Sequence, residues 1–251
     1  MATNVLSGLA VADDINDDGD SLGGFSLLES EAYIMNIKQA FIITSPKGAT
    51  GVSFEFTGAN NSMLNTTIYV TSGTAKGGKN YYIRKDKNTG VETKHYLPGF
   101  NQVQAICQLT LGKNLQELAG MTDKKHLNLY DKTAGKKTPT EIDSITPLIG
   151  QDIALGILKQ LVDKNELDPA TGTYKPSGKT REENEVNKVF HAITGLTFLE
   201  AKANATEPKK LAEWRALNAG KIKDKTTKTP GVVAGGAPAV GGAAPTTNQF
   251  K

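Results

Sequence analysis

Cations and tyrosines lie close together in one Gly-containing stretch of the chain, residues 76–100. The cations are Lys76, Lys79, Arg84, Lys85, Lys87 and Lys94, and the tyrosines are Tyr81, Tyr82 and Tyr96. Single-stranded nucleic acid is held by cations that follow its phosphates and by aromatic rings on which its bases stack. We therefore interpret this segment as a mobile basic loop with the side chains that such binding requires.

The tyrosines of this segment also have a structural interpretation. Tyr81 and Tyr82 are adjacent, so in a hairpin they would point to opposite faces and one of them would enter the core. Tyr69 lies on the face of its expected strand that points away from the core, which makes it a further candidate for base stacking. The sequence leaves open which of these rings are exposed.

Two further turns are basic. Lys132, Lys136 and Lys137 surround Gly135, and a second group places Lys175 and Lys179 beside Tyr174. A single basic turn is usually a solvated loop. Several of them converging on one side of a β-rich domain would form a positively charged groove.

Catalytic and metal-binding motifs are not found. The three histidines, His95, His126 and His191, lack a second ligand at metal spacing. No Gly-x-Ser-x-Gly motif precedes an expected helix. We predict a protein that is not an enzyme, with no catalytic residues, no metal and no cofactor.

Two partial motifs fail on a required position. Ser177-Gly178-Lys179-Thr180 resembles the end of a phosphate-binding loop, but that motif needs a glycine at position 173, which is Thr173. Residues 14–25 resemble a calcium loop, but its twelfth position, normally a bidentate Glu, is Phe25. Both segments are interpreted as solvated chain.

Charge is distributed unevenly along a chain whose net charge is only +3. Residues 1–20 contain five Asp and no Lys or Arg, whereas residues 206–251 carry eight basic and three acidic residues. No apolar run approaches the ~18–20 residues that span a bilayer, no secretory signal is recognised, and Cys107 is the single cysteine. We expect a cytoplasmic protein without membrane contacts.

The pattern of elements predicts a mainly β domain with added helices (α+β). Strands are expected at residues 31–44, 52–57, 64–71, 127–131 and 153–162. Helices are expected at residues 101–119, 180–191 and 208–220. Tight turns between the first three strands favour an antiparallel sheet or barrel. The expected organisation is an acidic, disordered N-terminus (1–22), one domain (23–226) and a flexible Gly/Ala/Pro-rich tail (227–251).

The order of these features resembles the single-stranded DNA-binding proteins of tailed bacteriophages, which are built on the OB-fold. The resemblance covers about residues 25–225 and depends on the opening strands, Asn80-Tyr81-Tyr82, Leu97-Pro98-Gly99-Phe100, the run from Asn184 to Phe190, and the residues from Thr197 to Glu200. It implies an OB-fold-like antiparallel barrel and sequence-tolerant binding of single-stranded DNA in phage replication or recombination. It further implies phage replication proteins as partners in the host cytoplasm.

The tail departs from that family, in which an acidic terminus with an aromatic residue is common. This chain ends Asn248-Gln249-Phe250-Lys251. In this chain the acidic cluster of residues 13–20, in place of the tail, would compete with DNA for the binding groove. The competing interpretation of the whole chain is a phage structural or adaptor protein without nucleic-acid affinity. An enzyme acting on DNA would need a carboxylate or histidine cluster, and the spacing of the acidic residues singles none out.

Overall fold

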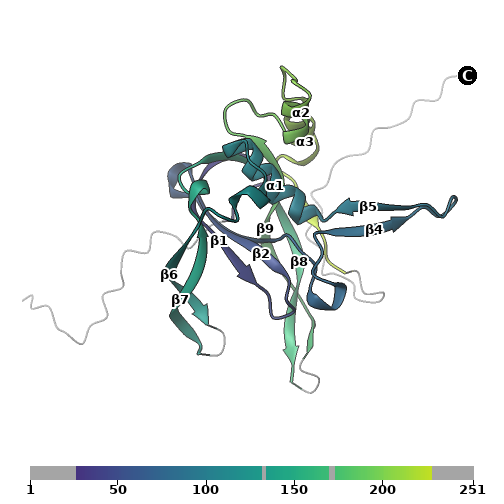
Figure 1. Ribbon diagram of the computed structural model, residues 1–251. Coiled ribbons are helices and arrows are strands. Elements are labelled where there is room, and N and C mark those ends of the chain that lie inside the picture. Colours follow the sequence, from purple (N-terminus) through teal and green to yellow (C-terminus); the bar gives the residue numbers. More distant parts are fainter. Residues whose placement is uncertain (1–26, 132–133, 170–172, 228–251) are drawn as a thin grey trace, which may run out of the picture. The chain divides into compact units, whose positions relative to one another are not determined.

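The computed structural model describes residues 27–131, 134–169 and 173–227, which form a mainly β fold of antiparallel strands with three α-helices (Figure 1). The strands are β1 Glu31–Thr44, β2 Thr50–Gly58, β3 Met63–Tyr69, β4 Tyr81–Lys85, β5 Glu92–Tyr96, β6 Thr122–Asp131, β7 Lys136–Ile145, β8 Asp152–Asp168, β9 Thr173–His191 and β10 Ile222–Asp224. The α-helices are α1 Pro98–Leu111, α2 Phe198–Lys202 and α3 Lys209–Asn218. The predicted mainly β class with added helices is confirmed.

Strand β1 is the centre of the larger sheet. One of its edges pairs with β2, which in turn pairs with β3. Its other edge is shared, because Glu31–Asn36 pair with β8 and Phe41–Ile42 pair with β7. Strand β9 then pairs with β8, and β6 with β7. The first strands of the sequence therefore hold together segments that are more than a hundred residues distant along the chain.

A bulge in β1 changes which side chains face the core. The register with β2 shifts between Ile37 and Gln39, and a bulge reverses the side-chain alternation beyond it. Met35 and Ile37 face the main core, but beyond the bulge Ala40 does so. An unbroken alternation would place Phe41 and Ile43 on the face of Met35, but neither belongs to the main core.

The core lies between this sheet and α1. Val52, Phe54 and Phe56, which alternate along β2, enter it, and the rings of the two phenylalanines stack with centroids 5.2 Å apart. Helix α1 contributes Val103, Ile106 and Cys107. The predicted helices over 101–119 are α1 and the 3-10 turn Leu115–Leu118, with the start of α1 three residues earlier because Pro98 fits the first helical position.

The single thiol of the chain is buried in this core. Burial in apolar surroundings raises the pKa of Cys107 to about 12, and the thiolate is the reactive form. We expect no reaction of the folded protein with Ellman's reagent at about pH 8, and reaction of one thiol per chain after denaturation. Rapid stoichiometric reaction without denaturant would show that α1 does not pack as described.

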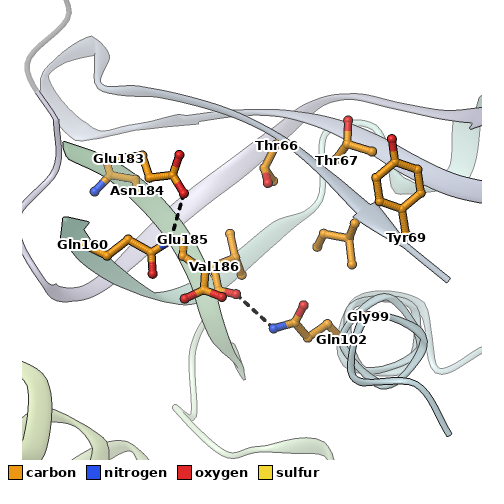
Figure 2. A pocket seen from close by; sticks show the side chains of 11 residues that line it. Thr66, Thr67, Tyr69, Gly99, Gln102, Gln160, Glu183, Asn184, Glu185 and Val186 are labelled. Atoms are coloured by element: carbon orange, nitrogen blue, oxygen red, sulfur yellow. Dashed lines mark hydrogen bonds between the residues drawn. The ribbon is translucent and has the colours of Figure 1, made fainter. Parts of the chain in front are cut away.

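The described strands do not close into a barrel, so an OB-fold relationship stays a prediction. Edge strands β3 and β9 both border one pocket, and α1 lies at its end (Figure 2). Gln102 of α1 donates from Nε2 to the carbonyl oxygen of Val186 on β9, at 2.9 Å. Gly99 lies so close to β3 that a Cβ there would be 2.2 Å from the Tyr69 carbonyl oxygen. The helix therefore occupies the gap between the two edges.

Two segments differ from the prediction. The expected helix over residues 180–191 is part of β9, and residues 173–178, where no strand was expected, form the start of the same strand. Val189 packs in the main core, and the next residue, Phe190, packs in a second cluster with Leu158 and Trp214. A strand that is buried on both faces has apolar residues at irregular spacing, which resembles helical periodicity.

The second cluster fixes α3 against the sheet. Trp214 is buried, and its Nε1 donates to Asn187 Oδ1 at 2.8 Å. The predicted helix over 208–220 is confirmed as α3. Leu217, three residues further along the same helix, is exposed.

The chain divides into two compact units, and of the described residues the larger holds 27–131, 134–160 and 182–223. The smaller unit holds 161–169, 173–181 and 224–227 of the described residues. Within it, Lys175 Nζ lies 2.6 Å from Asp168 Oδ2, and Thr227 N donates to Asp163 Oδ2 at 2.8 Å. The acidic N-terminus, the calcium-loop-like residues and most of the Gly/Ala/Pro-rich tail lie outside the described residues.

Candidate nucleic-acid interface

The basic segment forms a two-stranded hairpin, β4–β5, which extends away from the larger sheet (Figure 1). Tyr81 pairs with Tyr96 and Lys85 with Glu92. At its tip Asp86 accepts hydrogen bonds from the backbone N–H groups of Thr89 and Asn88, both at 2.8 Å, and these bonds lower the pKa of Asp86. The expected mobile loop is therefore an ordered antiparallel arm.

Two backbone hydrogen bonds close the base of the hairpin. Ser72 N donates to the Lys79 carbonyl oxygen at 2.8 Å, and Leu97 N donates to the Asn80 carbonyl oxygen at 2.9 Å. The same region forms a pocket of about 350 Å³, lined by Ser72, Lys76, Lys79, Tyr81, Tyr82, Ile83 and Leu97. The base of the arm thus combines cations, aromatic rings and a concave surface.

Neither of the adjacent tyrosines enters the core, contrary to expectation. They do face opposite sides of the hairpin, but the hairpin has no core beneath it. Tyr81 is partly buried because two cations cover its ring, with Lys94 Nζ at 5.1 Å and Lys79 Nζ at 5.6 Å from the centroid. Tyr82 is exposed and stacks on His95 across the strand pair, with centroids 5.6 Å apart.

Three tyrosine rings of the predicted site are open to solvent. Tyr69, Tyr82 and Tyr96 are 45%, 46% and 57% exposed. Tyr96 is supported by Phe100, whose ring centroid lies 4.8 Å away. Tyr69 lies over Gly51 of β2, where a Cβ would be 3.0 Å from the ring. Each ring is held by a neighbour and remains partly exposed, which suits it for stacking on a base.

The six cations of the segment are available for a ligand. Lys76, Lys79, Arg84, Lys85, Lys87 and Lys94 are all exposed, and among the described residues none of them forms a salt bridge. Elsewhere, Lys124 lies 3.0 Å from Asp143, and Lys159 lies 3.0 Å from Glu29. Because no carboxylate of the described residues competes for these cations, they are available to pair with phosphate groups.

The other predicted basic turns do not join this hairpin in one groove. Lys136 and Lys137 lie in β7, in a hairpin with β6 that extends from a different side of the sheet (Figure 1). Lys132 lies outside the described residues. Lys175 is engaged with Asp168 within the smaller unit. The predicted site is therefore concentrated in β4–β5 with Tyr69, and the positively charged groove expected from converging turns is not formed by β4–β5 and β6–β7.

Several contributing residues were not identified from the sequence. His95 supports Tyr82, Phe100 supports Tyr96, and Gly51 supports Tyr69. The contacts of His95 and Gly51 depend on strand register, and that of Phe100 depends on how α1 follows β5. Tyr130 of β6 is 63% exposed and pairs with Lys137, but it lies outside the hairpin.

Other kinds of site find no support in the part of the chain that the structure describes. No group of three His, Cys, Asp or Glu side chains within it could hold a metal ion, and no helix within it is long and apolar enough to cross a membrane. Comparisons with protein-family models, curated proteins and solved structures found no match to this chain.

Proposed function

We propose that this chain binds single-stranded DNA without strong sequence preference, as an OB-type module of phage replication or recombination. The β4–β5 hairpin carries the proposal, since its exposed cations, which form no salt bridge with the described residues, lie beside exposed tyrosine rings. Its phosphate contacts would come from Lys76, Lys79, Arg84, Lys85, Lys87 and Lys94. Bases would stack on Tyr69, Tyr82 and Tyr96, each stack contributing about 1–3 kcal/mol.

The proposal assigns no catalytic group and no cofactor to the chain. Phosphate contacts by lysine and arginine are insensitive to sequence, and every base has a face that can stack. The OB-type relationship draws support from the bulged central strand that pairs with three others and from the helix that follows the third strand and the hairpin. Cytoplasmic location and phage replication partners are part of the same proposal.

Binding should be strongly dependent on salt. Fluorescence anisotropy with a labelled oligo-dT should detect binding at about 50 mM salt, with an affinity that falls as salt rises. On single strands the slope of log K against log[salt] is about −0.7 for each phosphate contacted, so three to six contacts predict a slope of about −2 to −4. Duplex DNA of the same length is the control, since its stacked bases cannot reach the tyrosines.

The absence of oligo-dT binding at this salt concentration would refute the proposal. Stable oligomers in size-exclusion chromatography, together with no affinity for any nucleic acid, would instead support the structural or adaptor protein. Equal binding of duplex and single strand would leave the cations as the contact surface but remove the tyrosines from it.

A further inference from the structure

A second pocket, separate from the hairpin, lies between the unpaired edges of β3 and β9. It has a volume of about 360 Å³ and is lined by Thr66, Thr67, Ile68, Tyr69, Gly99, Gln102, Gln160, Glu183, Asn184, Glu185 and Val186 (Figure 2). Its volume lies within the range of small-molecule sites. Leu64, Ile68 and Val70 continue the apolar core face of β3 and its extension, whereas Thr66 on the same face is polar. The apolar core face of β3 is therefore interrupted by a polar side chain at the pocket.

The wall of this pocket contains a buried acceptor without a partner. Gln160 is only 5% exposed, and its Nε2 donates to Glu183 Oε1 at 3.0 Å, which fixes the orientation of the amide. Its Oε1 is buried and accepts no hydrogen bond from any residue that the structure describes. An unsatisfied buried polar atom costs about 1–3 kcal/mol, so a donor that reached Gln160 Oε1 would gain that interaction.

The chemistry of the lining selects the kind of ligand. Glu183 and Glu185 place carboxylates at the pocket, and these repel phosphate and attract N–H donors. The partly exposed ring of Tyr69 borders the same pocket, which suits a planar ligand. Gly99 of this pocket and Leu97 of the hairpin pocket are two residues apart, so a strand bound along the hairpin lies close to the β3–β9 pocket.

From this combination we infer that the β3–β9 pocket binds one unpaired nucleobase that carries an exocyclic amine. One N–H of the amine donates to Gln160 Oε1 and the other to a carboxylate oxygen of the pocket, while the sugar and phosphate remain outside the pocket. Cytosine, adenine and guanine have such an amine. Thymine has a single ring N–H between two carbonyl oxygens, and those oxygens would face the carboxylates. The choice of a nucleobase rests on the proposed function, whereas the donor requirement rests on the pocket alone.

Free nucleosides test the pocket independently of DNA binding. Deoxycytidine and thymidine are titrated into the ¹⁵N-labelled full chain up to about 10 mM, which detects millimolar affinities. Deoxycytidine should shift the backbone amide signals of residues 66–69 and 183–186, and thymidine should bind at least about fivefold more weakly, from the ~1–3 kcal/mol that such donor contacts contribute. No shift in these segments, or equal binding of the two nucleosides, would overturn the inference.

Substitutions connect the effect to the acceptor. Gln160→Met removes the unpartnered oxygen and should reduce the preference for deoxycytidine to about one, and Thr66→Val provides a second variant should Gln160→Met fail to fold. Ser144→Ala is the matched control, because Ser144 Oγ is also buried without a partner but does not line the pocket. The control should keep the preference. A preference unchanged in both pocket variants would contradict the inference.

Two further titrations separate the possible failures. Oligo-dC should bind more tightly than oligo-dT in wild type and equally in Gln160→Met. Nucleoside binding without oligonucleotide binding would refute the proposed function and leave the pocket assigned to a free base. N-methylguanidine, which resembles the end of an arginine side chain, is the second probe. If it shifts the signals of residues 66–69 and 183–186 and neither nucleoside does, the inference that the pocket binds a nucleobase is refuted and the pocket is assigned to an arginine side chain.

Discussion

Replacing Lys76, Arg84, Lys85 and Lys87 together by glutamine should weaken oligo-dT binding by on the order of 10³-fold at about 50 mM salt. Each lost phosphate contact removes about 0.7 of a released counterion, which corresponds to roughly eightfold in affinity at this concentration. The salt slope should become shallower by about 3. These four side chains are exposed and form no salt bridge among the described residues, so the hairpin itself should remain folded. Anisotropy titrations at several salt concentrations measure both quantities.

The matched control removes the same number of charges elsewhere. Lys38, Lys202, Lys209 and Lys223 are exposed and lie outside β4–β5, so their replacement by glutamine lowers the net charge equally. We expect this variant to change affinity by less than about tenfold and to keep the wild-type slope, because screening limits the effect of distant charges. Similar losses in both variants would show that net charge, and not the hairpin, determines binding.

Truncation of Trp214 to alanine should destabilise the protein by about 3–5 kcal/mol. Trp214 is 5% exposed, and its ring packs edge-on against Phe190 with centroids 6.5 Å apart. Its Nε1 donates to Asn187 Oδ1 at 2.8 Å, and its ring covers Gly156 of β8, where a Cβ would be 3.0 Å from it. The substitution opens a cavity and removes the donor that satisfies Asn187. Urea unfolding measured by circular dichroism gives the change in free energy.

Leu217 provides the control on the same helix. It is 69% exposed, so Leu217→Ala should change stability by less than about 0.5 kcal/mol. The loss of stability in Trp214→Phe should fall between those of Trp214→Ala and Leu217→Ala, because an aromatic ring is kept and the hydrogen bond is lost. A Trp214→Ala variant as stable as wild type would mean that α3 does not pack on the sheet. Affinity for oligo-dT under native conditions should be unchanged, since Trp214 is remote in sequence from the hairpin and does not line either pocket.

The sequence alone predicted the local features of this protein. The first three strands follow from alternation such as Val52, Phe54 and Phe56, which one buried face imposes on a strand. Helix α3 follows from a proline at its start and a glycine beyond its end. The cations and tyrosines of residues 76–96 were identified by composition, because their chemistry does not depend on the fold.

Tertiary structure decided where those features lie and which of them act together. Strand β9 appeared helical because its two buried faces place Val186, Val189 and Phe190 at helix-like spacing. The bulge in β1 moved Ala40 to the core, and register placed Gly51 beneath Tyr69 and His95 beside Tyr82. The pocket between β3 and β9 joins residues more than a hundred positions apart. Such contacts depend on strand pairing between distant segments, and the local sequence does not specify which distant segment becomes a neighbour.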